Sequence, residues 1–438
     1  MVWRGDNEVL SELRREMADE KVNHFDTIAI SRTVSVFKGR NCTNQEAFMS
    51  TLALTGTTRR WITRLHRWNG LFLLAFLMVD GITGGILSFR WEIDRAINPH
   101  LFSVAPQTES MPYKALIDVV ERRFPDAIVS NVVVPKTSQD AAIVYIKSRM
   151  DAHVAHVHVP GMKSSVEFNQ IFVNPHSGEI LGQRSTTRFV PTWENFVPDI
   201  ARLHLSLFLD EVGAWLMGVC AVVWFLTTLL GLVLTWPAAW RSLQSWKPLM
   251  SLRTDNGSYM LNYDLHRMAS LVTLPILVVV AFTSIYMNMP NVVRPVVRAF
   301  SPLFDFAVVP SSGHMDLATP RVPVEQVIAT ARDTLPGARV HSVGQDFLKG
   351  LYSVRMQLPG DVSPTGNNTV FVRMTDGQVI FQRKIRDASG GDVFLAWQWP
   401  LHTGRAFGRL GQCLILVGAI ALVIMCITGF NIWLRKRP

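Results

Sequence analysis

Four stretches of this 438-residue chain are long and apolar enough to cross a lipid bilayer. A helix needs about 20 consecutive apolar residues to span a hydrocarbon core about 30 Å thick. The first stretch carries one acid, Asp80, and the other three carry no charged residue; they cover residues 68–89, 212–236, 268–289 and 410–434. One such run could be a buried helix of a soluble protein. Four of them predict a membrane protein with four transmembrane helices in the lipid bilayer.

The short flanks of these stretches predict the orientation of the chain. Lys and Arg collect on the cytoplasmic side, and short loops carry this signal because long loops cross the membrane largely regardless of charge. Basic residues lie before the first stretch, in the short second connection and at the end of the chain: Arg59, Arg60, Arg64, Arg67, Arg241, Lys247, Arg253, Arg435, Lys436 and Arg437. Both termini are therefore expected in the cytoplasm. The net charge of +9 is explained by these flanks, and no nucleic-acid partner is expected.

The two long connections then lie outside the cytoplasm, which in a bacterium is the periplasm. Neither contains a cysteine, since the four are Cys42, Cys220, Cys413 and Cys426, so each connection is expected to fold around its own core. Apolar spacing predicts helices over 113–124 and 324–335, each stopped by a proline and followed by alternating strand segments. Each connection should therefore be a small α+β domain, a helix on an antiparallel sheet.

The chain is also an internal duplication with a period near 200 residues. Three landmarks recur at offsets of 200, 199 and 198: Leu65-His66-Arg67 as Leu265-His266-Arg267, Phe172-Val173 with Gly178 as Phe371-Val372 with Gly377, and Leu203-His204 as Leu401-His402. Each half therefore consists of a span, an outer domain and a second span.

The boundaries expected from these patterns follow the duplication. Residues 1–58 are polar and lack the apolar stretch of a cleavable signal, so they are expected to be a disordered cytoplasmic extension ahead of an uncleaved signal anchor. Transmembrane helices are expected over 59–89, 203–236, 266–289 and 401–438, the last with the cytoplasmic C-terminus; outer domains over 90–202 and 290–400; and a cytoplasmic connection over 237–265.

Four histidines occupy matched positions at the ends of the four spans. His66 and His266 precede the first and third spans, and His204 and His402 precede the second and fourth. The expected topology places the first two at the cytoplasmic face and the other two at the periplasmic face. Two facing imidazoles can ligate one metal centre between helices of a bundle, so two centres are expected.

Haem fits such pairs better than zinc does. A haem iron has two axial positions that histidines can fill, whereas zinc usually takes three or four ligands and no Cys, Asp or Glu recurs beside all four histidines. Arginines that could pair with haem propionates lie within three residues of the histidines: Arg67, Arg267, Arg202 and Arg405. These arginines could instead mark only the membrane edge. A continuous helix from His204 to Trp236 would be about 48 Å long, which would leave a long gap for electrons. Tilting, a bend near Asp210-Glu211-Val212-Gly213 or aromatic residues between the centres would have to shorten this gap.

The motifs resemble the PepSY-associated transmembrane family from about residue 59 onward. The likeness rests on residues 65–71 with Gly81, Thr83 and Gly84, on the Gly178 motif and on Leu265-His266-Arg267. It implies two periplasmic PepSY-like α+β domains on a four-helix bundle in the bacterial inner membrane. It also implies a di-haem reductase of ferric siderophores. Asp80 departs from the family, which more usually has a small residue there. It could serve a proton path or a haem hydrogen bond, or be an acid that is merely tolerated in a water-filled place.

The function expected from the sequence is an oxidoreductase that carries two bis-histidine haem b groups. It would move electrons across the inner membrane to a periplasmic ferric siderophore and release Fe(II). No nucleotide-binding fingerprint is present, so the expected donor is a membrane quinol or a cytoplasmic reductase. The alternative is a non-enzymatic envelope protein whose outer domains bind a peptide, a protease or a transporter. A metal or siderophore contact is also conceivable at His153, His156 and His158.

The orientation can be tested with reporter fusions near residues 150 and 350. Both fusion points should behave as periplasmic, because the Lys and Arg bias of the short flanks places both long connections on that side. Alkaline phosphatase activity and the absence of a cytoplasmic reporter signal would measure this. Cytoplasmic activity at either point would contradict the predicted topology.

Overall fold

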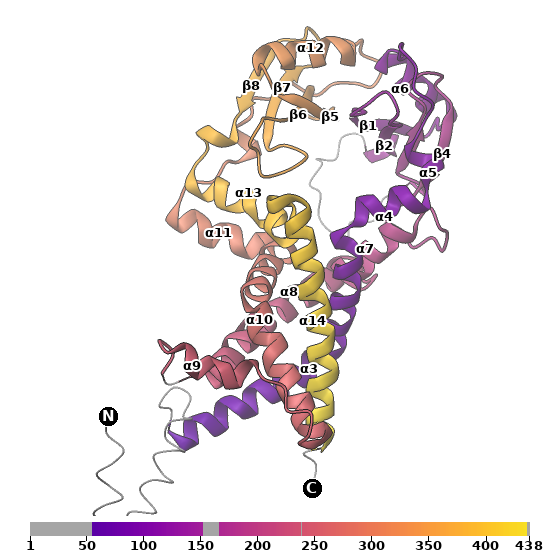
Figure 1. The fold of residues 1–438 in the computed structure, drawn as a ribbon. Helices are drawn as coiled ribbons and strands as arrows, with labels where there is room; N and C mark the ends of the chain where they lie inside the picture. The colour runs from indigo at the N-terminus through magenta and orange to yellow at the C-terminus, as the bar shows by residue number, and fades with distance from the viewer. Residues whose placement is uncertain (1–54, 152–165, 238, 436–438) are drawn as a thin grey trace, which may run out of the picture. The chain divides into compact units, whose positions relative to one another are not determined.

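The computed structural model describes residues 55–151, 166–237 and 239–435 (Figure 1). Residues 1–54 of the expected N-terminal extension lie outside this range. So do Cys42, the His153, His156 and His158 group, and Lys436 and Arg437.

Four helices among the described residues are long and apolar enough to cross a membrane. They are α3 (Gly56–Ser88), α8 (Asp210–Thr235), α10 (Gly257–Asn288) and α14 (Gly408–Arg435). Only 22–33% of their most apolar windows is buried inside the protein, so most of this apolar surface needs lipid around it. The prediction of four transmembrane helices is confirmed. The chain is a multi-pass α+β membrane protein.

The described chain divides into two compact units. The first contains residues 55–62 and 232–251, where Arg59 donates a hydrogen bond to the carbonyl of Leu234 and Trp236 packs against Trp240 and Trp246 beside α9 (Leu243–Trp246). The second contains residues 63–231 and 252–435. Within the second unit α3, α8, α10 and α14 each contribute to one apolar cluster that includes Leu73, Cys220, Leu277 and Leu422.

The second and fourth spans are each preceded by a separate helix. α7 (Phe196–Ser206) ends before α8 begins, and α13 (Gly390–His402) ends before α14. Positive backbone φ angles mark both breaks, at Leu207, Phe208 and Asp210 in the first half and at Gly404 and Gly408 in the second. The expected single helices from 203 to 236 and from 401 onward are therefore wrong in this respect. His204 and His402 belong to the shorter helices.

The two outer connections form one antiparallel sheet of eight strands, not two separate sheets. Its order is β4-β3-β2-β1-β5-β6-β7-β8, so the first four strands come from the first half and the last four from the second. The strands are β1 (Ala127–Val133), β2 (Ala142–Ser148), β3 (Gln170–Val173), β4 (Ile180–Arg184), β5 (Arg339–Asp346), β6 (Leu351–Gln357), β7 (Asn368–Arg373) and β8 (Val379–Arg383).

The two halves of the duplication pair with each other at the centre of this sheet. Val132 of β1 pairs with Val343 of β5, an offset of 211 residues that also separates Pro125 from Pro336. Because Val132 thus faces its own counterpart, a pseudo-twofold axis passes through this pair. Gln345 crosses the same seam and donates a hydrogen bond to the carbonyl of Val129.

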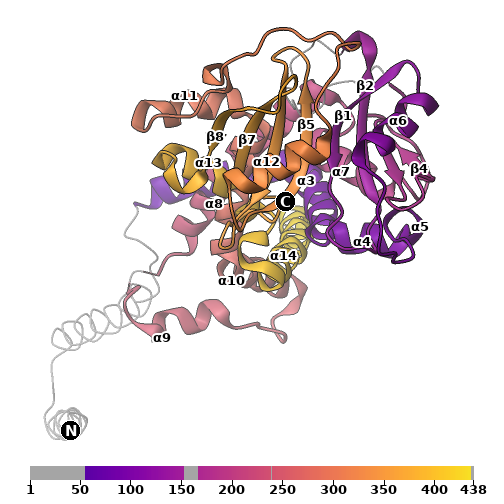
Figure 2. The same cartoon turned by 90° about the horizontal axis from the view of Figure 1, so that it is seen from above.

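One hydrophobic core lies beneath both halves. α6 (Tyr113–Arg123) and α12 (Val324–Thr334) pack on the same side of the sheet and share buried residues with strands of both halves (Figure 2). The expectation that each connection folds around its own core is therefore wrong, because the β1–β5 pairing merges the two cores. Three further helices follow the C-terminal ends of α3 and α10: α4 (Arg90–Ile97), α5 (Pro99–Phe102) and α11 (Pro290–Phe300).

Candidate functional site

The four matched histidines form two facing pairs in the second unit. The ring centres of His66 and His266 lie 6.4 Å apart with an interplanar angle of 87°. Those of His204 and His402 lie 6.2 Å apart at 57°. α3 and α10 carry the first pair, and the last turns of α7 and α13 carry the second.

In the first pair, hydrogen bonds to neighbouring helices fix the ring tautomer. His66 Nδ1 lies 3.1 Å from the carbonyl oxygen of Thr227 on α8. His266 Nδ1 lies 3.1 Å from the carbonyl oxygen of Met425 on α14. A carbonyl oxygen can only accept, so each Nδ1 carries the hydrogen and each Nε2 keeps its lone pair for a metal.

In the second pair, threonine hydroxyls fix the same ring tautomer. Thr83 Oγ1 lies 2.9 Å from His204 Nδ1, and Thr283 Oγ1 lies 3.1 Å from His402 Nδ1. Each hydroxyl donates its own hydrogen to a carbonyl one turn back on its helix, at Val79 and Val279. Each threonine oxygen is therefore an acceptor for the imidazole N–H, and Nε2 is again the ligand atom.

Three of the four rings rest on a glycine of a neighbouring helix. A Cβ at Gly231 would lie 3.0 Å from His66 Cε1, a Cβ at Gly429 3.2 Å from His266 Cε1, and a Cβ at Gly84 3.1 Å from His204 Cε1. Only the missing side chain lets these rings approach so closely. The fourth ring has no such glycine, because Ser284 stands where the repeat would place one.

A cavity of about 720 Å³ opens beside His204 and His402. Its walls come from all four spans and reach the sheet, where it is lined by Arg90, Trp91, Tyr145, Arg355 and Trp399. This volume lies within the usual range of ligand pockets, about 300–1,000 Å³.

Cations concentrate at the sheet end of this cavity. The guanidinium carbon of Arg405 lies 3.8 Å from the Trp91 ring centre, that of Arg90 lies 5.6 Å away, and Lys136 Nζ lies 5.7 Å away. Burial, together with the charges of Arg355, Lys136 and Arg339, lowers the pKa of nearby His341 to about 4. Such a group of cations suits an anionic ligand.

The arginines expected to bind propionates have varied surroundings. Arg405 is largely buried and lies 3.5 Å from a Glu92 oxygen. Arg267 pairs with Asp264 at 3.0 Å, and Arg202 pairs with Asp210 at 3.0 Å. Arg67 is exposed and lies over the Trp68 ring. Arg90 and Arg355, which line the cavity, were not singled out from the sequence.

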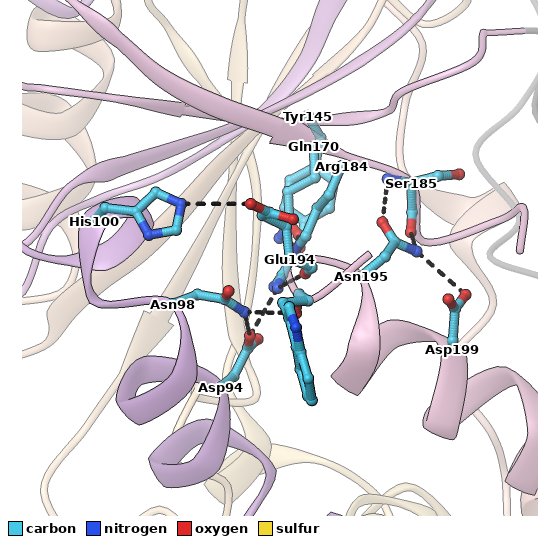
Figure 3. Close-up of polar contacts among 11 residues, drawn as sticks. Asp94, Asn98, His100, Tyr145, Gln170, Arg184, Ser185, Glu194, Asn195 and Asp199 are labelled. Carbon is cyan, nitrogen blue, oxygen red and sulfur yellow. Dashed lines mark hydrogen bonds and ion pairs between the residues drawn. The ribbon is translucent and has the colours of Figure 1, made fainter. Parts of the chain in front are cut away.

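A buried polar network connects the sheet with the helix that carries His204 (Figure 3). Arg184 at the end of β4 forms an ion pair with Asp94 of α4 at 2.9 Å, with both side chains at most 7% exposed. Beyond it, Asn195 exchanges hydrogen bonds with the backbone of Ser185 and donates to Asp199 in the first turn of α7. Losing one partner of a buried pair such as Arg184 with Asp94 typically costs about 3–5 kcal/mol, because an uncompensated buried charge remains. The Asn195 hydrogen bonds join the start of α7 to the residue that follows β4.

The donor set fits a six-coordinate haem iron. An imidazole nitrogen binds a metal at about 2.0 Å with its ring centre about 1.1 Å behind, so two rings on opposite sides of one iron have centres about 6.2 Å apart. The observed separations are 6.4 and 6.2 Å. Among the described residues no group of three or more His, Cys, Asp or Glu side chains could hold a metal ion, so each histidine pair offers two protein ligands.

The hydrogen-bond acceptors and the glycines beside the histidines recur with the period of the duplication. The acceptors Thr227 and Met425 are 198 residues apart, as are Gly231 and Gly429, and Thr83 and Thr283 are 200 apart. These offsets match those of the histidines, so searching for them would have found the acceptors and the glycines.

Comparison with known proteins agrees with the repeat and the four spans. No curated protein matches the sequence. One family, described as the PepSY-associated TM region, matches residues 63–436, which is most of the chain. By this match the protein belongs to the PepSY-associated transmembrane family.

Proposed function

We propose that this protein is a haem-dependent membrane oxidoreductase that reduces a ferric siderophore and releases Fe(II). The proposal rests on the two facing histidine pairs, His66–His266 and His204–His402. In each pair both Nδ1 atoms hydrogen-bond to neighbouring helices, which leaves both Nε2 atoms to bind a metal.

In this proposal one set of residues binds the haem groups, and a second set orients the binding residues. His66 with His266, and His204 with His402, would each hold one haem b. Such a haem gains and loses one electron at a potential set by its ligands and surroundings. Thr227, Met425, Thr83 and Thr283 orient the rings, and the matched glycines leave room for them.

The helix breaks shorten the path between the two pairs. His66 and Thr83, the contact of His204, are 17 residues apart on α3, which is about 25 Å at 1.5 Å per residue. This is about half the length of the continuous helix considered from the sequence. The intervening core is closely packed, and Trp224 lies within it, 7% exposed and lining the cavity of the second pair.

The cavity beside His204 and His402 is the proposed acceptor site. Its arginines and aromatic rings suit an anionic iron chelate. Hard oxygen donors hold Fe(III) far more tightly than Fe(II), so one electron is enough to loosen the metal. In this proposal the sheet and the cavity face the periplasm of a bacterium, and a quinol or a cytoplasmic reductase supplies electrons at the His66–His266 end.

Histidine replacement tests the pairing. His66→Ala and His266→Ala should each remove the same haem, and His204→Ala and His402→Ala should each remove the other, because each haem needs both of its ligands. Pyridine haemochrome stoichiometry and reduced-minus-oxidised spectra measure the loss. Removal of both haems by every single variant would leave the pairing unsupported.

A glycine variant tests the geometry without touching a ligand. Gly231→Ala places a Cβ 3.0 Å from His66 Cε1, and overpacking of this kind typically costs about 1–3 kcal/mol. Retention of the His66–His266 haem should fall by about tenfold, while the other haem stays. Gly70→Ala is the matched control, because a Cβ there meets nothing within 4 Å. Equal haem content in both variants would contradict the proposed ring position.

Reoxidation tests the activity. The dithionite-reduced protein should be reoxidised by a ferric siderophore under anaerobic conditions, with an Fe(II) chelator trapping the product. His402→Ala should slow this at least tenfold, because it removes a ligand of the haem that would pass the electron to the acceptor in the cavity. If the reduced spectrum persists over a panel of ferric siderophores and ferric citrate, the reductase assignment fails. The family's outer domains would then be better explained as a binding module for a peptide, a protease or a transporter.

A further inference from the structure

One carboxyl group that lines the cavity, that of Asp80, has no counterpart in the other half of the chain. Asp80 lies on α3, and one of its oxygens, Oδ1, is buried without a hydrogen-bond partner among the described residues. The repeat places Val280 at the equivalent position on α10, 200 residues later. An unpaired carboxylate inside a membrane span is costly, so a structural role alone does not account for it.

The imidazole ring of His204 lies close to this carboxyl group. Asp80 Oδ1 lies 3.5 Å from His204 Nδ1, the same nitrogen that Thr83 Oγ1 contacts at 2.9 Å. The other neighbours that line this part of the cavity are Leu77, Cys220, Trp224 and Leu422, so the field of the carboxylate is only weakly screened.

The second half provides an internal comparison. His402 Nδ1 contacts Thr283 Oγ1 at 3.1 Å, as His204 contacts Thr83. With Val280 in place of an acid, His402 has the threonine but no carboxylate. The two ligands of this pair therefore differ in two neighbours: His204 has the Asp80 carboxyl and Gly84, where His402 has Val280 and Ser284.

We propose that Asp80 is a positioning residue that polarises His204 and lowers the reduction potential of the haem held by His204 and His402. This inference rests on the proposed function only in requiring that the pair holds haem. A carboxylate beside the N–H of a ligating imidazole makes the other nitrogen more basic, and a more basic ligand favours the ferric iron. The haem next to the cavity is then a stronger reductant than it would be without Asp80. This suits an acceptor whose Fe(III) is tightly chelated.

The test is a redox titration of the full-length protein in detergent, followed by haem absorbance, with the low-spin EPR spectrum as a second readout. The two components are assigned in the His66→Ala background, where one haem remains. Asp80→Val should raise the potential of the His204–His402 haem and leave that of the other haem unchanged. It should also shift the EPR g values away from those of a ligand with imidazolate character. Asp80→Asn, which removes the charge but keeps an acceptor, should shift the potential in the same direction.

A charge swap provides the matched control. Val280→Asp should lower the potential of the same haem further, and the double variant Asp80→Val/Val280→Asp should return it toward the wild-type value by moving the carboxylate to His402. Asp80→Val is expected to fold, because the chain carries valine at the equivalent site and the change removes a buried unpaired charge.

Two results would overturn the inference while leaving the proposed function intact. One is a wild-type protein with two haems whose potentials do not respond to Asp80→Val. The other is an equal shift of both haems, which would indicate a long-range charge effect and no action through His204. A wild-type protein that binds no haem would overturn the proposed function itself.

Discussion

Each histidine of the two pairs gives one ring nitrogen to another helix, and the arrangement of the bundle depends on these hydrogen bonds. A bond from His66 to the carbonyl of Thr227 fixes the rotation of α3 against α8, and a bond from His266 to Met425 does the same for α10 and α14. Backbone groups within a membrane are otherwise satisfied inside their own helix. A carbonyl that accepts a second hydrogen bond from an imidazole therefore sets both the helix contact and the tautomer of the ligand.

At the other end of the bundle, the breaks between α7 and α8 and between α13 and α14 also place a histidine against another helix. Had α7 continued into α8, His204 would lie on a helix directed away from α3. Leu207, Phe208 and Asp210, all with positive φ, turn the chain here, and His204 contacts Thr83. The second half makes this turn with Gly404 and Gly408, for which positive φ carries little strain. Non-glycine residues in this conformation are commonly found near functional sites, and here they lie a few residues from a proposed ligand.

The parts of this structure that could be predicted from the sequence are those with a local or repeated signal. The four spans follow from hydropathy alone, and the histidine pairs follow from their place in the duplication. The joined sheet could not be predicted, because the pairing of Val132 with Val343 links residues 211 positions apart and apolar spacing does not identify the partner of an edge strand. A bend near Asp210-Glu211-Val212-Gly213 was one of three ways to shorten the second helix, and the sequence could not choose among them, because Leu207, Phe208 and Asp210 are not the glycines that usually mark such a turn. Asp80 was recognised as unusual, and a proton path or a haem hydrogen bond was suggested for it, but its position beside His204 could not be predicted.

The pairing of β1 with β5 has a consequence for the history of the chain. A single repeat would end its four-stranded sheet at β1, leaving a row of unpaired N–H and C=O groups that invites another strand. The strand that fits it in this protein is the equivalent strand of a second repeat, related by the axis through Val132 and Val343. Contacts of this kind are those of a twofold symmetric homodimer. An ancestor of half this length would have assembled as such a dimer, with each copy supplying one histidine to each pair, and gene fusion would then have freed the two copies to diverge at positions such as Asp80 and Val280.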